Sequence, residues 1–160
     1  MTSDRAAHAP EPRSEALGWT LVSIQFALLG TIGVDVVRAR RLGGILGVLG
    51  IAAIAGGTTF IALASRLLGR RLRAHPAPHP EAVLRTDGVY GVVRHPIYLG
   101  LLLLATGGLL IARTRRALVA VAMLAALLHM KSDLEEEMLA ERFPDYDLYA
   151  ARVPKIVPLP

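Results

Sequence analysis

Residues 42–68 read LGGILGVLGIAAIAGGTTFIALASRLL, and Arg66 is the one charged side chain among them. A hydrocarbon core of ~30 Å is spanned by roughly 20 apolar residues in a helix, so this stretch is long enough to cross a membrane. Its six glycines lie inside an apolar helix and follow no strand, which favours close helix packing over a nucleotide-binding loop. The stretch therefore predicts a transmembrane helix that packs tightly against a neighbour.

Three more apolar blocks flank this stretch, at Leu17–Val37, Ile97–Ala112 and Ala117–Met130. The last two are short, since sixteen helical residues reach only about 24 Å, and we expect them to form a tight hairpin that turns at residues 113–116. The chain is 53% hydrophobic and 19% charged, with a mean hydropathy of +0.46, which excludes a small soluble globule. We therefore predict an all-α integral membrane protein with about four transmembrane helices, ending in a C-terminal helical hairpin.

Charge and composition exclude several functional classes. The 160 residues contain no cysteine, which excludes a disulfide framework, a thiolate zinc site and a cysteine nucleophile. The net charge of +5 comes from arginines at the ends of the apolar blocks, which indicates membrane-flanking charge and no nucleic-acid partner. His75 and His79 lie among prolines that prevent an aligning helix, and no carboxylate cluster adjoins them, so no metal site is expected.

We expect a single membrane domain over residues 1–160. Its predicted parts are a disordered tail, two transmembrane helices, a cytoplasmic loop, the helical hairpin, and an amphipathic helix with an extended tail, at residues 1–14, 15–68, 69–96, 97–130 and 131–160. This arrangement puts twelve of the 18 lysines and arginines on one side, which predicts that both termini are cytoplasmic. Arginine outnumbers lysine 16 to 2, as in GC-rich bacterial genes, so we expect the cell (inner) membrane.

Two features of the first apolar block bear on its role. The block starts late and is long, and no small-residue cleavage site precedes a soluble domain, so we expect no signal peptide. Asp35 is the one acid within a predicted span, and it lies three residues before Arg38 near the helix end. A local ion pair between these two residues is therefore expected.

Residues 84–100 lead from a proline-broken loop into the third apolar block and are too polar for a simple connection. Pro96 suits the first turn of a helix, and it favours an extended conformation for His95. Arg94 and His95 are thus expected at the start of a helix near the membrane surface, where the helix N-terminus favours an anionic group. Gly100 and Gly107 share one face and leave a flat strip for a helix or a ligand.

The segment from His129 to Pro158 is the second polar region. We expect the fourth helix to continue beyond the bilayer as an amphipathic helix, with Glu135 on the same side as Leu139 and Phe143. Glu136 lies on the neighbouring face. Two carboxylates at a membrane surface suit a cationic ligand, although an acidic run by itself is more often a solvated helix face.

Together, the two polar regions resemble the superfamily of isoprenylcysteine carboxyl methyltransferases and phospholipid methyltransferases, which are integral membrane enzymes. The motif residues of the first region are Gly88, Tyr90, Arg94, His95, Pro96, Tyr98 and Gly100. Those of the second are Glu135, Glu136, Leu139, Phe143, Tyr146, Tyr149, Val153, Pro154 and Pro158. The chain departs from the pattern in a third glutamate, Glu137, and in Pro144, which stands where a glycine is usual. The resemblance covers residues 84–160.

The resemblance implies a methyltransferase that takes S-adenosylmethionine in a cytoplasmic cofactor pocket. Its sulfonium and ammonium would pair with Glu135 and Glu136, and its carboxylate with Arg94 or the helix N-terminus. The cofactor-binding residues expected on this basis are Tyr90, Arg94, His95, Pro96, Tyr98, Gly100, Glu135 and Glu136. Arg152 is the expected catalytic residue, where it would orient an anionic acceptor. The acceptor would be a lipid or another lipophilic small molecule from the membrane.

Two other functions compete with this interpretation. A membrane reductase of the sterol-reductase type, using NADPH, is similar in its C-terminal region, and Arg70, Arg71 and Arg73 suit its 2′-phosphate. A non-enzymatic membrane protein is the other alternative. No residue selects the methyl acceptor, the choice among O-, N- and S-methylation, or the oligomeric state.

Overall fold

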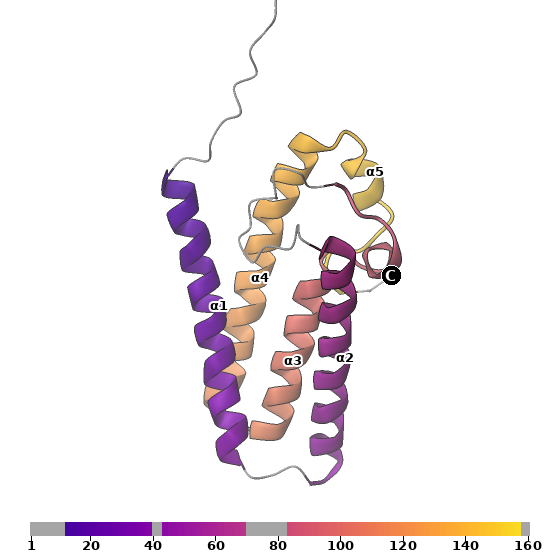
Figure 1. The fold of residues 1–160 in the computed structure, drawn as a ribbon. Helices are drawn as coiled ribbons and strands as arrows, with labels where there is room; N and C mark the ends of the chain where they lie inside the picture. Colours follow the sequence, from indigo (N-terminus) through magenta and orange to yellow (C-terminus); the bar gives the residue numbers. More distant parts are fainter. Residues whose placement is uncertain (1–11, 40–42, 70–82, 158–160) are drawn as a thin grey trace, which may run out of the picture.

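The computed structural model describes residues 12–39, 43–69 and 83–157, and every regular element within these ranges is helical. The elements are α1 (Pro12–Ala39), α2 (Ile45–Leu68), the short 3-10 helix η2 (Gly88–Gly91), α3 (Pro96–Ala112), α4 (Arg115–Arg142) and α5 (Tyr146–Ala150). Figure 1 shows α1 to α4 side by side, with η2, α5 and the C-terminal tail gathered at one end of the bundle. The prediction of an all-α fold is confirmed.

Three helices in the described part of the chain are long and apolar enough to cross a membrane, namely α1 from Ala16, α2 and α4. Helix α3 is apolar too, but its 17 residues reach only about 25 Å, so the predicted fourth span is not confirmed. Large apolar side chains on α1 and α2, such as Trp19, Phe26 and Val48, are exposed. Such a surface suits helices that face lipid.

Glycines let the backbones of α2 and α3 come into direct contact, as the glycine-rich stretch predicts. A Cβ added to Gly57 would lie 2.5 Å from the carbonyl oxygen of Gly100, and one on Gly107 would lie 2.5 Å from that of Gly50. No side chain larger than hydrogen fits at such contacts. The flat strip of Gly100 and Gly107 therefore receives a helix, and Gly100 packs against α2.

The predicted hairpin of α3 and α4 is confirmed, with a turn at Arg113 and Thr114. Arg113 adopts a left-handed conformation with φ 55°, and the Thr114 side chain caps α4 by accepting from the Ala117 N–H at 3.0 Å. The same turn holds α1: the Thr114 hydroxyl donates to Asp35 at 2.6 Å, and Arg116 forms an ion pair with this buried carboxylate. The predicted local pair with Arg38 is wrong, because Asp35 faces the hairpin turn.

One further expectation, about the N-terminal end of the chain, is corrected. Helix α1 begins at Pro12, which suits a first helical turn, so residues 12–14 of the predicted disordered tail are helical. Before the predicted extended tail, Tyr146 and Tyr149 are buried side chains of the short helix α5, and residues 153–157 of the tail contain no helix. Expectations for residues 1–11, for His75 and His79, for the arginines at 70, 71 and 73, and for Pro158 fall outside the described residues.

Candidate functional site

The C-terminal tail lies across the start of α3. Pro96 occupies the first turn of this helix, where its missing N–H costs no hydrogen bond. The backbone N–H groups of Arg94 and His95 donate to the carbonyl oxygens of Pro154 and Lys155, both at 2.9 Å. The segment before α3 and the C-terminal tail are therefore joined by backbone hydrogen bonds, and together they cover one side of the site.

Arg94 joins α4 to the tail. Its Nε and Nη2 donate to the two carboxylate oxygens of Glu136 at 2.9 and 3.1 Å, a bidentate and charge-assisted pair. Its Nη1 donates to the carbonyl oxygens of Ala150 and Val153 at 2.7 and 2.6 Å. All three nitrogens of the guanidinium are therefore used within the protein, and the expectation that Arg94 binds a cofactor carboxylate is not supported by this geometry.

His95 lies between the two glutamates and is only 7% exposed. Its Nδ1 is 3.3 Å from a Glu135 oxygen, and its Nε2 is 3.0 Å from a Glu136 oxygen. Burial acts to lower the pKa of His95, but hydrogen bonds to the two carboxylates and their negative charges outweigh burial and raise it. A protonated imidazole donates through both nitrogens, which matches two carboxylate neighbours.

Tyr98 completes the contact between α3 and α4. Its hydroxyl donates to Glu135 Oε1 at 2.5 Å, and its ring stacks on His95 with 5.3 Å between centroids and 5° between planes. The stack fixes the imidazole and the phenol as one unit. Glu135 thus faces two donors, the hydroxyl of Tyr98 on the first turn of α3 and the imidazole of His95 just before this helix.

The adjacent glutamates differ in their surroundings. Glu136 faces the positive charges of Arg94, His95 and Lys155, the last at 3.5 Å, and its side chain is 18% exposed. In the described part of the chain, Glu135 lies against His95 and Tyr98, and its side chain is 21% exposed. Glu136 is therefore the neutralised centre of the cluster, whereas Glu135 keeps more of its capacity for a cation.

Three tyrosines border this cluster. The Tyr149 hydroxyl donates to the carbonyl oxygen of Tyr90 at 2.6 Å, which attaches α5 to η2, and burial raises the pKa of Tyr149 to about 12. Tyr146 packs edge-on against Tyr149 with 6.0 Å between centroids. The hydroxyl of Tyr146 is buried, and it has no hydrogen-bond partner among the described residues. A buried hydroxyl of this kind is a polar group available to a ligand.

A family model of phospholipid methyltransferases matches residues 45–146, from the start of α2 to the first residue of α5. The chain belongs to the phospholipid methyltransferase family. The matched region holds the Arg-His-Pro motif and both glutamates, while α1 and the tail after Tyr146 lie outside it. No curated protein and no solved structure matches the chain. Family membership, with the apolar helices, makes the protein a membrane methyltransferase.

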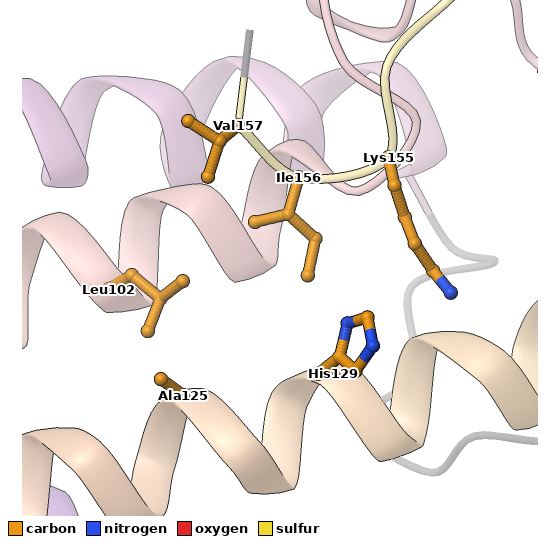
Figure 2. A pocket seen from close by; sticks show the side chains of 6 residues that line it. All are labelled: Leu102, Ala125, His129, Lys155, Ile156 and Val157. Atoms are coloured by element: carbon orange, nitrogen blue, oxygen red, sulfur yellow. The ribbon is translucent and has the colours of Figure 1, made fainter. Parts of the chain in front are cut away.

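A hollow of about 300 Å³ lies between α3, α4 and the tail (Figure 2). Leu102, Ala125, Ile156 and Val157 give it apolar walls, and His129 and Lys155 add two basic groups. Lys155 also contacts Glu136, so the hollow adjoins the charged cluster. A ligand with a polar end and an apolar part fits such a lining.

The structure brings together Arg94, His95, Tyr98, Glu135 and Glu136, which are separated by about forty residues of sequence. Other predicted site residues lie elsewhere or act through the backbone. Gly100 faces α2, and Pro96 starts α3. Arg152 is exposed on the turn after α5, and within the described residues its side chain forms no hydrogen bond or ion pair with the cluster.

Sequence reasoning missed two basic residues. Lys155 follows the Val-Pro pair of the tail, and its contact with Glu136 depends on the path of the tail over α3. Lys131 is buried one helical turn before Glu135, although its position after an apolar block is typical of a lysine at a membrane boundary. The spacing of four residues between Lys131 and Glu135 is the signal that places both on one face of α4.

Proposed function

We propose that this membrane methyltransferase uses S-adenosylmethionine and methylates a lipophilic acceptor that reaches the site from the membrane. One observation carries the proposal: Glu135 and Glu136 of α4 lie against Arg94, His95 and Tyr98 at the start of α3. This meeting of two carboxylates with a helix start is what the resemblance of the two motif regions implies for the cofactor site.

The donor set suits S-adenosylmethionine in three respects. Glu135 offers a partly buried carboxylate to the sulfonium or the ammonium. The Tyr146 hydroxyl is buried and open to a new hydrogen bond. Arg94 is held by Glu136 and the tail through all three guanidinium nitrogens. We therefore assign the cofactor carboxylate to His129 and Lys155 of the hollow, where it would displace the half-exposed Asp133 carboxylate that now pairs with both.

The proposed site works by positioning. The cofactor supplies an electrophilic methyl group on a sulfonium, and the residues of the chain hold the two reactants in line. Holding reactants in a near-attack geometry is worth about 7–11 kcal/mol of the barrier in favourable cases. Arg94 and Glu136 keep the tail closed over α3, and the Tyr98–Glu135 pair fixes the carboxylate that faces the cation.

We assign a lipophilic acceptor because the hollow is mostly apolar and α1, α2 and α4 expose apolar surface to lipid. Helix α5 and the tail lie at one end of the bundle (Figure 1), and we place this end on the cytoplasmic side of the inner membrane. Arg152 is exposed at this end, and we propose that it meets a polar or anionic headgroup of the acceptor.

Calorimetry on the purified protein in detergent tests the cofactor. We expect S-adenosylmethionine to bind the wild type and to lose measurable binding to Glu135→Gln. Glu137→Gln is the matched control, because Glu137 is exposed on the same helix and has no contact with the cluster among the described residues. Binding of NADPH without binding of S-adenosylmethionine would instead support a reductase, and binding of neither would support a non-enzymatic role.

A second experiment identifies the acceptor. The purified protein is incubated with a membrane lipid extract and S-adenosylmethionine carrying a labelled methyl group, and the products are separated by mass spectrometry. We expect label in one lipid class with the wild type and none with Glu135→Gln. Label confined to water-soluble compounds would contradict a lipophilic acceptor.

A further inference from the structure

A buried polar pair lies next to the site, on the side of α1. The Lys131 amino group donates to Gln25 Oε1 at 2.9 Å, and the two residues are 1% and 5% exposed. Burying an amino group and an amide is costly unless each finds hydrogen bonds, so a pair of this kind needs a compensating role or a precise fit. The pair joins α1 to α4.

Lys131 is also in contact with the residues of the site. Its Nζ lies 5.4 Å from the centroid of the Tyr98 ring, an arrangement in which the cation is attracted to the ring face. His95 stacks on the same ring, and the hydroxyl of that ring donates to Glu135. Tyr98 is therefore held by His95, Lys131 and Glu135, and Lys131 lies one helical turn from Glu135.

Gln25 is the link between the site and α1. Helix α1 lies outside residues 45–146, which match the family, but it provides the acceptor that fixes the Lys131 amino group. At the other end of the bundle, α1 is fixed by Asp35 and the turn between α3 and α4. Gln25 is thus placed to transmit the position of α1 to Tyr98 through one buried hydrogen bond.

We propose that Lys131, held by Gln25, is a positioning residue of the transferase site that fixes the Tyr98 ring and, through its hydroxyl, the Glu135 carboxylate. The effect on cofactor affinity rests on the proposed function. The effect on Tyr98 does not, since it concerns the free protein.

The first test measures Tyr98 in the absence of any cofactor. The chain is labelled with 3-fluorotyrosine, and the fluorine resonance of Tyr98 is assigned with Tyr98→Phe. We expect this resonance to shift in Lys131→Met and in Gln25→Leu. Ser23→Ala is the control, because the exposed Ser23 hydroxyl donates within α1, to the Trp19 carbonyl oxygen. An unmoved Tyr98 resonance in both variants would overturn the inference.

The second test measures affinity for S-adenosylmethionine by calorimetry. Gln25→Leu and Lys131→Met are expected to raise its Kd roughly tenfold or more, because a small misplacement of a binding group is expensive. Gln25→Glu keeps an acceptor for Lys131 and should retain an affinity close to that of the wild type. Unchanged affinity in Gln25→Leu and Lys131→Met would overturn the inference.

A double variant separates positioning from folding. Replacing both members of a buried polar pair by apolar residues of similar size is often neutral or stabilising, so Gln25→Leu with Lys131→Met should melt no lower than the wild type. We expect this double variant to keep a shifted Tyr98 resonance and a weakened Kd. Full recovery of both readouts would overturn the inference. A wild type that binds no S-adenosylmethionine, while the Tyr98 resonance still moves, would contradict the proposed function and leave the positioning role supported.

Discussion

Neighbouring glutamates on one helix have different roles in this protein. Glu136 forms a bidentate pair with Arg94 and also faces His95 and Lys155, so its charge is used to join α3, α4 and the tail. Glu135 accepts from Tyr98 and lies beside His95. The sequence assigns both carboxylates to a cationic ligand, since adjacency in a motif cannot tell which one is neutralised by the fold.

Glu136→Gln is expected to destabilise the protein, because it leaves Arg94 and His95 close together without the carboxylate between them. Removing one partner of a buried ion pair costs about 3–5 kcal/mol, and the partial exposure of Glu136 reduces this to about 1–3 kcal/mol. Thermal unfolding in detergent should show a clearly lower Tm for Glu136→Gln than for Glu135→Gln. Equal melting of the two variants would contradict the division of roles.

The stability of the site is expected to depend on pH through His95. Its pKa is raised in the folded state, because the two glutamates outweigh burial, so the folded state binds the proton more tightly than the unfolded chain. The stabilisation is fully present below the unfolded pKa of about 6.5 and is lost as the pH rises through the folded value. The Tm of the wild type should fall over this range relative to that of His95→Gln. Parallel Tm curves for the two proteins would contradict this role of His95.

At the scale of elements, the contact between α2 and α3 depends on glycines at defined positions. Gly57 faces the backbone of Gly100, whereas its neighbour Gly56 has no atom within 4 Å of an added Cβ. Adjacent glycines on one helix therefore provide a matched pair of variants, one at the interface and one away from it.

Gly57→Ala is expected to force α2 and α3 apart, because the new Cβ would lie 2.5 Å from a backbone oxygen that cannot rotate away. Overpacking of this kind costs about 1–3 kcal/mol. Gly56→Ala should be neutral or stabilising, since alanine favours a helix by up to ~1 kcal/mol over glycine. Thermal unfolding of both variants in detergent is the measurement, and equal losses of Tm would show that the glycines do not set the packing.

Patterns along the chain predict the helices, the hairpin and the tight packing of α2, because these follow from apolar length and glycine content. The resemblance of the two motif regions to the family also implies that the glutamates and the Arg-His-Pro segment meet. Partners that depend on how helices rotate against each other were not predictable. Asp35 bonds to Thr114 and Arg116 on the hairpin turn, 79 and 81 residues away. Gln25 and Lys131 are 106 residues apart, and no local periodicity connects them.

At the scale of the whole molecule, the bundle has two different ends. The charged cluster, α5 and the tail lie at one end, and the Asp35 contacts with the turn of α3 and α4 lie at the other (Figure 1). Helix α1 connects the two ends, because Asp35 bonds to the turn between α3 and α4 and Gln25 bonds to Lys131 near the charged cluster. The direction in which this bundle inserts therefore decides which compartment supplies the cofactor.

Because the chain has no cysteine, single introduced cysteines report the orientation without background. Gly43→Cys places a thiol at the exposed residue before α2, and Leu148→Cys places one on the exposed face of α5 at the opposite end. In intact spheroplasts, a membrane-impermeant maleimide should label Cys at position 43, while position 148 should react only after the membrane is opened. The excess of arginine and lysine that the sequence predicts on the side of both termini gives the expected direction. The reverse labelling pattern would place the site outside, where a cytoplasmic methyl donor does not reach it.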